Sequence, residues 1–337
     1  MNRFCTYCDR GYAARLLCLH DSLLAHGEPF RLSVLCFDEQ IEEIVAAEKS
    51  PSLEAIPLRE LLAADAGYAA VRPQRNRYEF YFTGTASIVR HCFARDPAAD
   101  RITYLDADLY FFGPPSRVFA EQGEASIGIV PHRFPPRLRE LERHGIYNVA
   151  WVSFRRDADG LACLDWWRER CLEWCYDRFE PGRFADQGYL DEFPRRFRGV
   201  RTLGHPGINA APWNVENVRL AVVDGQVRLD GQPLLFFHFQ GIREITPDWF
   251  DPGLRPYKAR FTTVLREAIY RPYLQLLAAE QDRLRARDGV EPVLGYHRLP
   301  TGPSWRNRWE RIKGRWLLPA YQRMRGRLIH VRPPGLP

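Results

Sequence analysis

The chain has 337 residues, with 48 basic and 42 acidic side chains and a formal net charge of +6. The positive excess lies at the end: the segment from Thr301 has nine basic residues and one acid. The first 300 residues, with 39 basic and 41 acidic side chains, carry a net charge of −2. This disfavours a nucleic-acid binder with a basic surface throughout. Hydrophobic residues make up 45% of the chain, enough for a packed core, and no run approaches the length of a membrane-spanning helix.

The eight cysteines all lie in the first 175 residues. The first residues lack the apolar core of a secretory signal, so we expect a cytoplasmic protein with reduced thiols. Cys5-x-x-Cys8 leaves a redox or zinc site open. A redox pair should open a helix, however, and Cys5 falls inside a predicted strand. We therefore interpret the cysteines as small core residues.

Strands and helices alternate along the first half of the chain. Apolar runs predict strands at 2–7, 31–37, 55–57, 125–130 and 147–154, and a further hydrophobic strand before Asp106 within the run 101–112. Helical spacing predicts helices at 11–26, 41–47, 58–64, 78–94 and 160–178. This alternation predicts an α/β fold with a mostly parallel central sheet flanked by helices. Asp224-Gly225 predicts a hairpin between 218–223 and 226–229, followed by a strand at 234–239. From 257 onward the pattern predicts helices and basic loops.

Asp106-Ala107-Asp108 follows a hydrophobic strand. Two carboxylates at i and i+2 of an extended chain point to the same side, and burying them unpaired would cost free energy. A divalent metal with oxygen ligands and substrate phosphates would explain the pair, and the carboxyl end of a strand is where α/β sheets bind ligands. The alternative is an acidic loop that caps the next element.

No G-x-x-x-x-G-K-[ST] or G-x-G-x-x-G motif follows the first strand, so P-loop phosphoryl transfer and dinucleotide oxidoreduction lose their main support.

Tyr104-Leu105-Asp106-Ala107-Asp108 resembles the "YLDAD" segment of GT-A-fold glycosyltransferases, and the closest pattern is glycosyltransferase family 8. The resemblance implies that Asp106, Ala107 and Asp108, with Mn²⁺ or Mg²⁺, hold a nucleotide-diphosphate sugar. It spans about residues 1–250. It also implies a GT-A catalytic domain at 1–255, followed by a helical, basic extension at 256–337.

Further segments resemble family motifs in the expected order. The resemblance implies that Asn148 lies near the sugar and acceptor, that Asp186 and Gln187 flank the donor sugar, and that His238 is the third metal ligand. The matching segments are Tyr147-Asn148-Val149-Ala150-Trp151-Val152 ("FNAGV"), Asp186-Gln187-Gly188-Tyr189-Leu190 ("DQDxLN"), Trp213-Asn214 ("WN") and His238-Phe239-Gln240-Gly241 ("HFxG"). Taken by themselves, Asp186 and Gln187 could cap a helix at 186–193, and a lone histidine in an apolar strand is more often a core residue.

In GT-A enzymes the edge after the first strand holds the base and ribose, which implies roles for Thr6, Tyr7 and Asp9. Asp9 could instead cap the first helix. Arg77, together with Arg72 and Arg75, could clamp phosphate or sugar, or form solvated surface.

The sequence departs from the family at two points. The family often has Lys-Pro-Trp after "HFxG", with the lysine on the diphosphate, whereas Gly241 is followed here by Ile242-Arg243-Glu244-Ile245. Arg243 or Lys258 could supply that charge. Gly188 replaces the second aspartate of "DQD".

We therefore expect a metal-dependent glycosyltransferase, with a nucleotide-diphosphate sugar as donor, UDP-linked in our interpretation, and a saccharide or lipid-linked acceptor. Family resemblance implies retention of the anomeric configuration. A sugar nucleotidyltransferase and a non-catalytic nucleotide-sugar-binding protein are the alternatives.

In the tail 301–337, aromatic residues interleave with arginines, which suits peripheral docking at the anionic inner face of a membrane. A solvated helix packed on the body would fit the same pattern.

Overall fold

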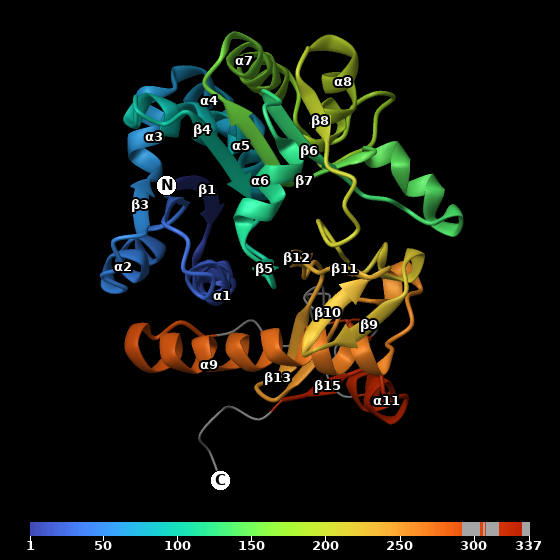
Figure 1. Ribbon diagram of the computed structural model, residues 1–337. Helices are drawn as coiled ribbons and strands as arrows, with labels where there is room; N and C mark the ends of the chain where they lie inside the picture. Colours follow the sequence, from blue (N-terminus) through green and yellow to red (C-terminus); the bar gives the residue numbers. More distant parts are fainter. Residues whose placement is uncertain (292–303, 306, 308–316, 332–337) are drawn as a thin grey trace.

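The computed structural model describes residues 1–291, 304, 305, 307 and 317–331 (Figure 1). Its centre is a seven-stranded sheet with the order β3–β2–β1–β4–β7–β6–β8, in which β7 runs antiparallel to the other six strands. The strands are β1 (Asn2–Cys8), β2 (Phe30–Cys36), β3 (Leu53–Pro57), β4 (Arg101–Leu105), β6 (Ile127–Pro131), β7 (Tyr147–Arg155) and β8 (Val200–Thr202). The predicted mostly parallel central sheet is thus confirmed.

Helices cover both faces of this sheet. Successive residues of β1 point to opposite sides: Phe4 packs with α1 and α2, and Cys5 packs with α5 and α7. The α-helices are α1 (Ala13–Leu24), α2 (Glu39–Ala47), α3 (Leu58–Ala64), α4 (Ala66–Val71), α5 (Arg77–Arg95), α6 (Pro115–Gln122), α7 (Ala158–Glu173), α8 (Phe193–Arg196), α9 (Arg271–Asp288) and α11 (Leu318–Met324). Among the described helices, none combines the length and the apolar character needed to cross a bilayer.

Smaller sheets complete the second half of the chain. β5 (Leu109–Phe111) pairs antiparallel with β12 (Phe236–His238). The predicted hairpin forms between β9 (Leu220–Val223) and β10 (Gln226–Leu229). It turns at Asp224 and Gly225, which both have positive φ, and β11 (Gln232–Pro233) extends it. The tail joins the body here, because β15 (Ile329–His330) pairs with β14 (Trp249–Asp251), which pairs with β13 (Arg243–Thr246).

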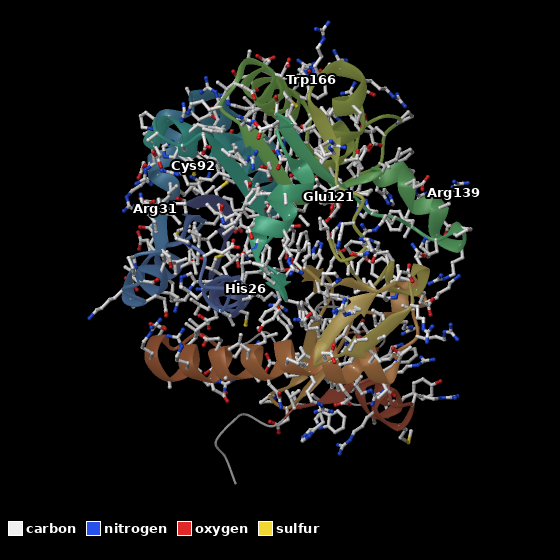
Figure 2. The ribbon with its side chains drawn as sticks, viewed as in Figure 1. His26, Arg31, Cys92, Glu121, Arg139 and Trp166 are labelled. Atoms are coloured by element: carbon white, nitrogen blue, oxygen red, sulfur yellow. The ribbon has the colours of Figure 1, made fainter. Side chains whose placement is uncertain are left out.

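Short 3₁₀ segments connect several of these elements. Asp9 caps the segment Arg10–Tyr12 by accepting from the Gly11 N–H, so α1 begins two residues later than the predicted helix. The segment η4 (Gln187–Glu192) occupies most of the helix predicted at 186–193, which continues as α8. The segment η3 (Pro136–His144) carries the exposed Arg139 at the edge of the molecule (Figure 2).

All eight cysteines are buried free thiols. Burial raises the pKa of Cys5 and Cys8 well above the ordinary value, so neither is a reactive thiolate. Within the described residues, the one group of three potential metal ligands contains no cysteine. The geometry therefore favours the core interpretation of Cys5-x-x-Cys8.

Candidate functional site

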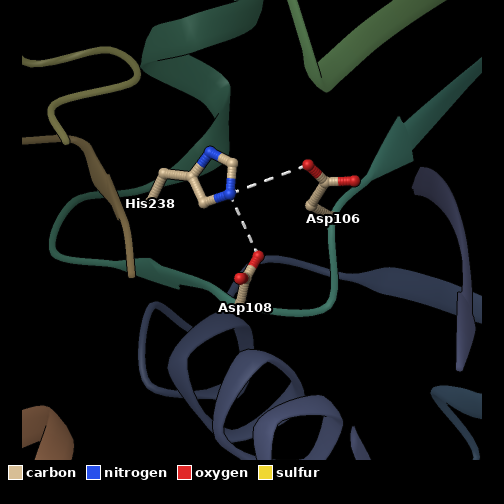
Figure 3. Close-up of side chains that lie close together, drawn as sticks. All are labelled: Asp106, Asp108 and His238. Carbon is tan, nitrogen blue, oxygen red and sulfur yellow. Dashed lines mark ion pairs between the residues drawn. The ribbon is translucent and has the colours of Figure 1, made fainter. Parts of the chain in front are cut away.

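Asp106, Asp108 and His238 converge at the carboxyl end of β4 (Figure 3). The His238 Nε2 atom lies 3.1 Å from Asp108 Oδ1 and 3.7 Å from Asp106 Oδ2. The expectation of an extended Asp106–Asp108 segment is wrong: the chain turns there, and the Leu109 N–H donates to the Asp106 carbonyl at 3.2 Å. The turn starts β5, and the β5–β12 pairing places His238 opposite Leu109. A strand that is distant in sequence thus supplies the third potential metal ligand of the cluster.

The charges at this cluster are poorly balanced without a cation. Burial raises the pKa of Asp106 to about 6, against the opposing effect of His238. The pKa of Asp108 is lowered, because the His238 charge and its hydrogen bond outweigh the effect of burial. Burial alone would lower the pKa of His238, but the two carboxylates raise it overall. One imidazole and two carboxylates with ligand atoms within 4.8 Å of one another fit a divalent ion.

Asn148 is the hub of a hydrogen-bond network behind the cluster. Its Oδ1 atom lies 3.2 Å from His238 Nδ1, and its Nδ2 atom lies 3.1 Å from Gln187 Oε1 and 3.2 Å from His132 Nε2. Gln187 in turn donates from Nε2 to the His144 carbonyl at 2.9 Å. Asn148 reaches this position because β7 runs antiparallel, which brings its first residues beside the end of β4.

Asp186 is buried next to Gln187 and lines the cleft. It accepts a hydrogen bond from the Thr85 hydroxyl at 2.7 Å. Burial raises the pKa of Asp186 to about 7, while that hydrogen bond acts in the opposite direction. The preceding residue, Ala185, is buried with φ of 45°, a conformation that costs free energy for a residue with a Cβ atom.

The edge after β1 combines aromatic rings with an ion pair. Tyr7 packs 5.5 Å from the Tyr104 ring, centroid to centroid. Asp9 forms an ion pair with Arg77 and accepts from the Tyr81 hydroxyl at 3.3 Å. Thr6, by contrast, is fully buried and is not among the described residues that line the cleft.

These groups open onto one cleft of about 640 Å³. The cleft brings together the predicted residues Tyr7, Asp9, Asp106, Ala107, Asp108, Asn148, Asp186, Gln187, Trp213 and His238. The cleft is also lined by apolar side chains that no sequence motif indicated, such as Phe134, Leu141 and Tyr257. The cleft is thus large enough for a ligand that contacts both the acidic cluster and the aromatic edge.

The remaining predicted residues are not among the described residues that line the cleft. Asn214 is buried and donates from Nδ2 to the His132 carbonyl at 2.9 Å, and Trp213 Nε1 donates to the same carbonyl at 2.9 Å. Gly241, Arg243 and Arg77 are exposed and are not among the described residues that line the cleft, although Arg77 reaches it through Asp9.

Two residues near the acidic cluster carry no motif and were missed in the sequence. Arg15 of α1 donates to the Ile242 carbonyl at 3.1 Å, and its charge helps to lower the pKa of Asp108. His132 is buried against Asn148. Two weak signals could have drawn attention to them: Arg15 lies near the start of the helix that follows the first strand, and His132 comes two residues after the predicted strand 125–130.

No protein-family model matches this chain. It is 31% identical over 251 residues to YfnF, an uncharacterized protein of Bacillus subtilis (strain 168), and the match covers 72% of this chain and 82% of YfnF. The chain belongs to the YfnF family. YfnD, an uncharacterized protein of the same organism, is 28% identical over 302 residues, covering 88% of this chain and 96% of YfnD.

Among solved structures, the galactosyltransferase LgtC in complex with donor and acceptor sugar analogues superposes with a TM-score of 0.51. The superposition covers 82% of this chain and 95% of LgtC, at 15% sequence identity. The predicted GT-A fold is thereby confirmed. At this identity the likeness concerns the fold alone.

Proposed function

We propose that this protein is a metal-dependent glycosyltransferase that transfers a hexosyl group from a nucleotide-diphosphate sugar, UDP-linked in our proposal, to a hydroxyl acceptor. The observation that carries the proposal is the buried Asp106–Asp108–His238 cluster at the carboxyl end of a central strand in a GT-A fold. Ligands of open α/β sheets bind at this edge. The likeness to LgtC, whose structure holds donor and acceptor analogues, supports the same use of the cleft.

Asp106, Asp108 and His238 would hold Mn²⁺ or Mg²⁺. Such an ion, when bound, offsets the negative charge that develops on a departing diphosphate. The chain's own groups would position the rest of the donor: Tyr7 and Asp9 would contact the nucleoside, with Arg77 fixing the Asp9 carboxylate through their ion pair. Ala107, in the turn between the two aspartates, would approach the donor through its backbone.

Asp186 and Gln187 would lie beside the sugar. The Gln187 amide oxygen already accepts from Asn148 and keeps a second lone pair, so it can face positive charge at the anomeric carbon. In a retaining reaction the leaving phosphate oxygen takes the acceptor proton, and no protein base is needed. Family resemblance supports that outcome. An inverting reaction would require a carboxylate base near the acceptor.

The test is a panel of nucleotide sugars incubated with and without Mn²⁺, with transfer and hydrolysis followed by chromatography. We expect one donor to be consumed only with metal, and consumption to fall at least about a hundredfold in Asp106→Ala. Glu39→Gln, which removes an exposed carboxylate far from the cluster along the chain, is the matched control. An Asp106→Ala variant as active as the wild type would refute the metal site.

Incubation with nucleoside triphosphates and sugar phosphates, together with a UDP-binding measurement, distinguishes the two alternatives. A sugar nucleotidyltransferase would release pyrophosphate from a nucleoside triphosphate and a sugar phosphate. A non-catalytic binding protein would bind UDP and turn over no donor. Either result would replace the proposed transfer reaction.

We further propose that the acceptor belongs to bacterial surface polysaccharide or glycolipid synthesis and that the tail docks peripherally on the anionic inner face of the membrane. Trp305, Leu317, Tyr321 and Met324 are exposed in the described part of the tail. Trp309 and Trp316, two further aromatic residues of the tail, lie outside the described residues.

A further inference from the structure

His132 follows β6 and is held rigidly from several sides. Its backbone N–H donates to the Ile146 carbonyl at 2.9 Å, and its own carbonyl accepts from Trp213 Nε1 and Asn214 Nδ2. Its ring stacks on Phe134, with centroids 4.6 Å apart and an interplanar angle of 11°. The side chain is 6% exposed. A histidine held this firmly presents a fixed pattern of hydrogen-bonding atoms to its neighbours.

The orientation of the His132 ring determines which nitrogen carries the proton. Nδ1 lies 3.3 Å from the Ile146 carbonyl oxygen, which can only accept, so Nδ1 is the donor. A neutral imidazole has one N–H, and Nε2 is therefore an acceptor. The atom that faces Nε2 at 3.2 Å must then be the amide nitrogen of Asn148.

This assignment orients the whole Asn148 amide. With its nitrogen toward His132, the amide presents Oδ1 to His238 Nδ1 at 3.2 Å. Two other contacts require the same orientation: the Ala150 N–H donates to Oδ1 at 3.2 Å, and Gln187 Oε1 lies 3.1 Å from the nitrogen. An amide oxygen only accepts, so the proton of His238 resides on Nδ1. When His238 is neutral, Nε2 therefore carries the lone pair, and this atom faces the space beside the two carboxylates, where a metal ion would take the place of the Nε2 proton.

We infer that His132 is a positioning residue for the metal ligand His238, acting through Asn148. This inference rests on the proposed function, because it assigns a role toward the proposed metal. The acceptor atom of His132 keeps the Asn148 amide in one orientation, and that orientation holds His238 in the tautomer that can ligate. Partners of this kind behind metal-binding histidines typically change metal affinity by about 10–100-fold when they are removed.

The test measures Mn²⁺ affinity in the absence of any donor, by the loss of the free-ion signal in electron paramagnetic resonance. His132→Leu removes the acceptor, and we expect Kd for Mn²⁺ to rise about tenfold, the lower end of that range, because the Ala150 N–H still holds the amide. His132→Gln can present an amide oxygen at the position of Nε2, and we expect it to bind Mn²⁺ with nearly wild-type affinity.

A second buried histidine provides the control for folding. His20 is 4% exposed and hydrogen-bonded to Ser52, so His20→Leu removes a comparable side chain outside the network. We expect it to lower the melting temperature without changing the Kd for Mn²⁺. Nitrogen-15 spectra of histidine-labelled protein loaded with Zn²⁺ report the tautomer directly, and His238 should carry its proton on Nδ1 in the wild type.

The outcomes separate the inference from the proposed function. Wild-type protein that binds no Mn²⁺ would overturn the metal site and the inference together. Wild-type protein that binds Mn²⁺, with His132→Leu binding equally tightly or His132→Gln as weakly as His132→Leu, would overturn the role of His132 alone.

Discussion

At the residue scale, the cleft keeps a buried carboxyl group at a cost in stability. Asp186 would ionise near its ordinary pKa of 3.8 in the unfolded chain, whereas burial raises its pKa to about 7 in the folded protein. Folding therefore disfavours the ionised form. This cost is absent below pH 3.8, grows as the pH rises from there to about 7, and is constant above.

Asp186→Asn should remove that cost and stabilise the protein at neutral and higher pH. We expect equal melting temperatures near pH 4, and a melting temperature about 5 °C higher for the variant at pH 8, given a pKa difference of this size. Thermal unfolding in the presence of a chelator measures this. A variant that is less stable than the wild type at pH 8 would contradict the argument, and loss of donor turnover would accompany the gain in stability if Asp186 serves the reaction.

Arg15 and Arg243 are competing candidates for the cation on the donor diphosphate. Arg15 lies close enough to Asp108 to lower its pKa, whereas Arg243 lies in register with Asp251 on the β13–β14 hairpin. We expect Arg15→Gln to weaken UDP binding about tenfold, the cost of one charge-assisted hydrogen bond, and Arg243→Gln to change it little. Calorimetric titration with UDP and Mn²⁺ compares the two variants. The reverse order would assign the diphosphate contact to Arg243.

Functional residues that belong to short local motifs could be predicted from the sequence. Asp106 and Asp108 could be named because carboxylates after an apolar strand are costly without a cation. His238 could be named only because its segment resembles a family motif. His132 could not be named, because its role arises from the ring orientation and from partners 14 to 82 positions away. Asn214 matched a motif, but its amide donates a hydrogen bond to the His132 carbonyl in the protein interior.

At the element scale, one half-buried arginine holds a loop in place. Arg133 donates to the carbonyls of His205, Pro206, Ile208 and Asn209, with distances of 3.2 Å to His205 and Asn209 and 3.4 Å to Pro206. Burial lowers the pKa of Arg133 to about 10, which leaves it charged at neutral pH. These carbonyls belong to the chain that leads into the Ala210–Phe237 bridge beside β12.

Arg133→Leu should lower the free energy of unfolding by about 3 kcal/mol, because it leaves several carbonyls without their donor. Denaturation by urea, followed by tryptophan fluorescence, measures the change. Arg139→Leu, on the exposed part of η3, is the matched control and should stay within about 0.5 kcal/mol of the wild type. Equal losses in the two variants would show that the loop does not depend on Arg133.

Periodicity predicted the long elements because burial on one face leaves a regular pattern. The strands β1, β2 and β7 and the helices α1, α5 and α7 all lie close to their predicted ranges. The turn at Asp106 was missed, because it depends on the pairing of β5 with β12, more than 120 residues later. Such long-range pairing leaves no local signal.

At the scale of the whole molecule, residues 328–331 of the tail are part of the body. Leu328, Ile329 and Val331 are buried, and β15 pairs with β14. Deleting 301–337 would therefore remove a strand along with the basic segment, and a loss of function would have two explanations. Point substitutions on the exposed arginines separate the two.

Replacing Arg323, Arg325 and Arg327 with glutamine should weaken binding to vesicles that contain anionic lipid. Each cation near such a surface contributes about 1 kcal/mol, so we expect a loss of about a hundredfold at physiological ionic strength. Sedimentation with anionic and with neutral vesicles measures binding, and donor hydrolysis in solution should stay unchanged. Unchanged sedimentation with anionic vesicles would contradict peripheral docking.

The contact between His132 and Ile146 has a consequence for how substrate range can diverge in this family. It closes the base of the segment 133–145, so the ends of that segment stay together whatever lies between them. The segment supplies Phe134 and Leu141 to the cleft wall. We expect its interior to tolerate exchange between relatives, which would alter the cleft wall and, in the proposed reaction, the choice of acceptor, while Arg133, the two strands at the base and the candidate metal ligands keep their places.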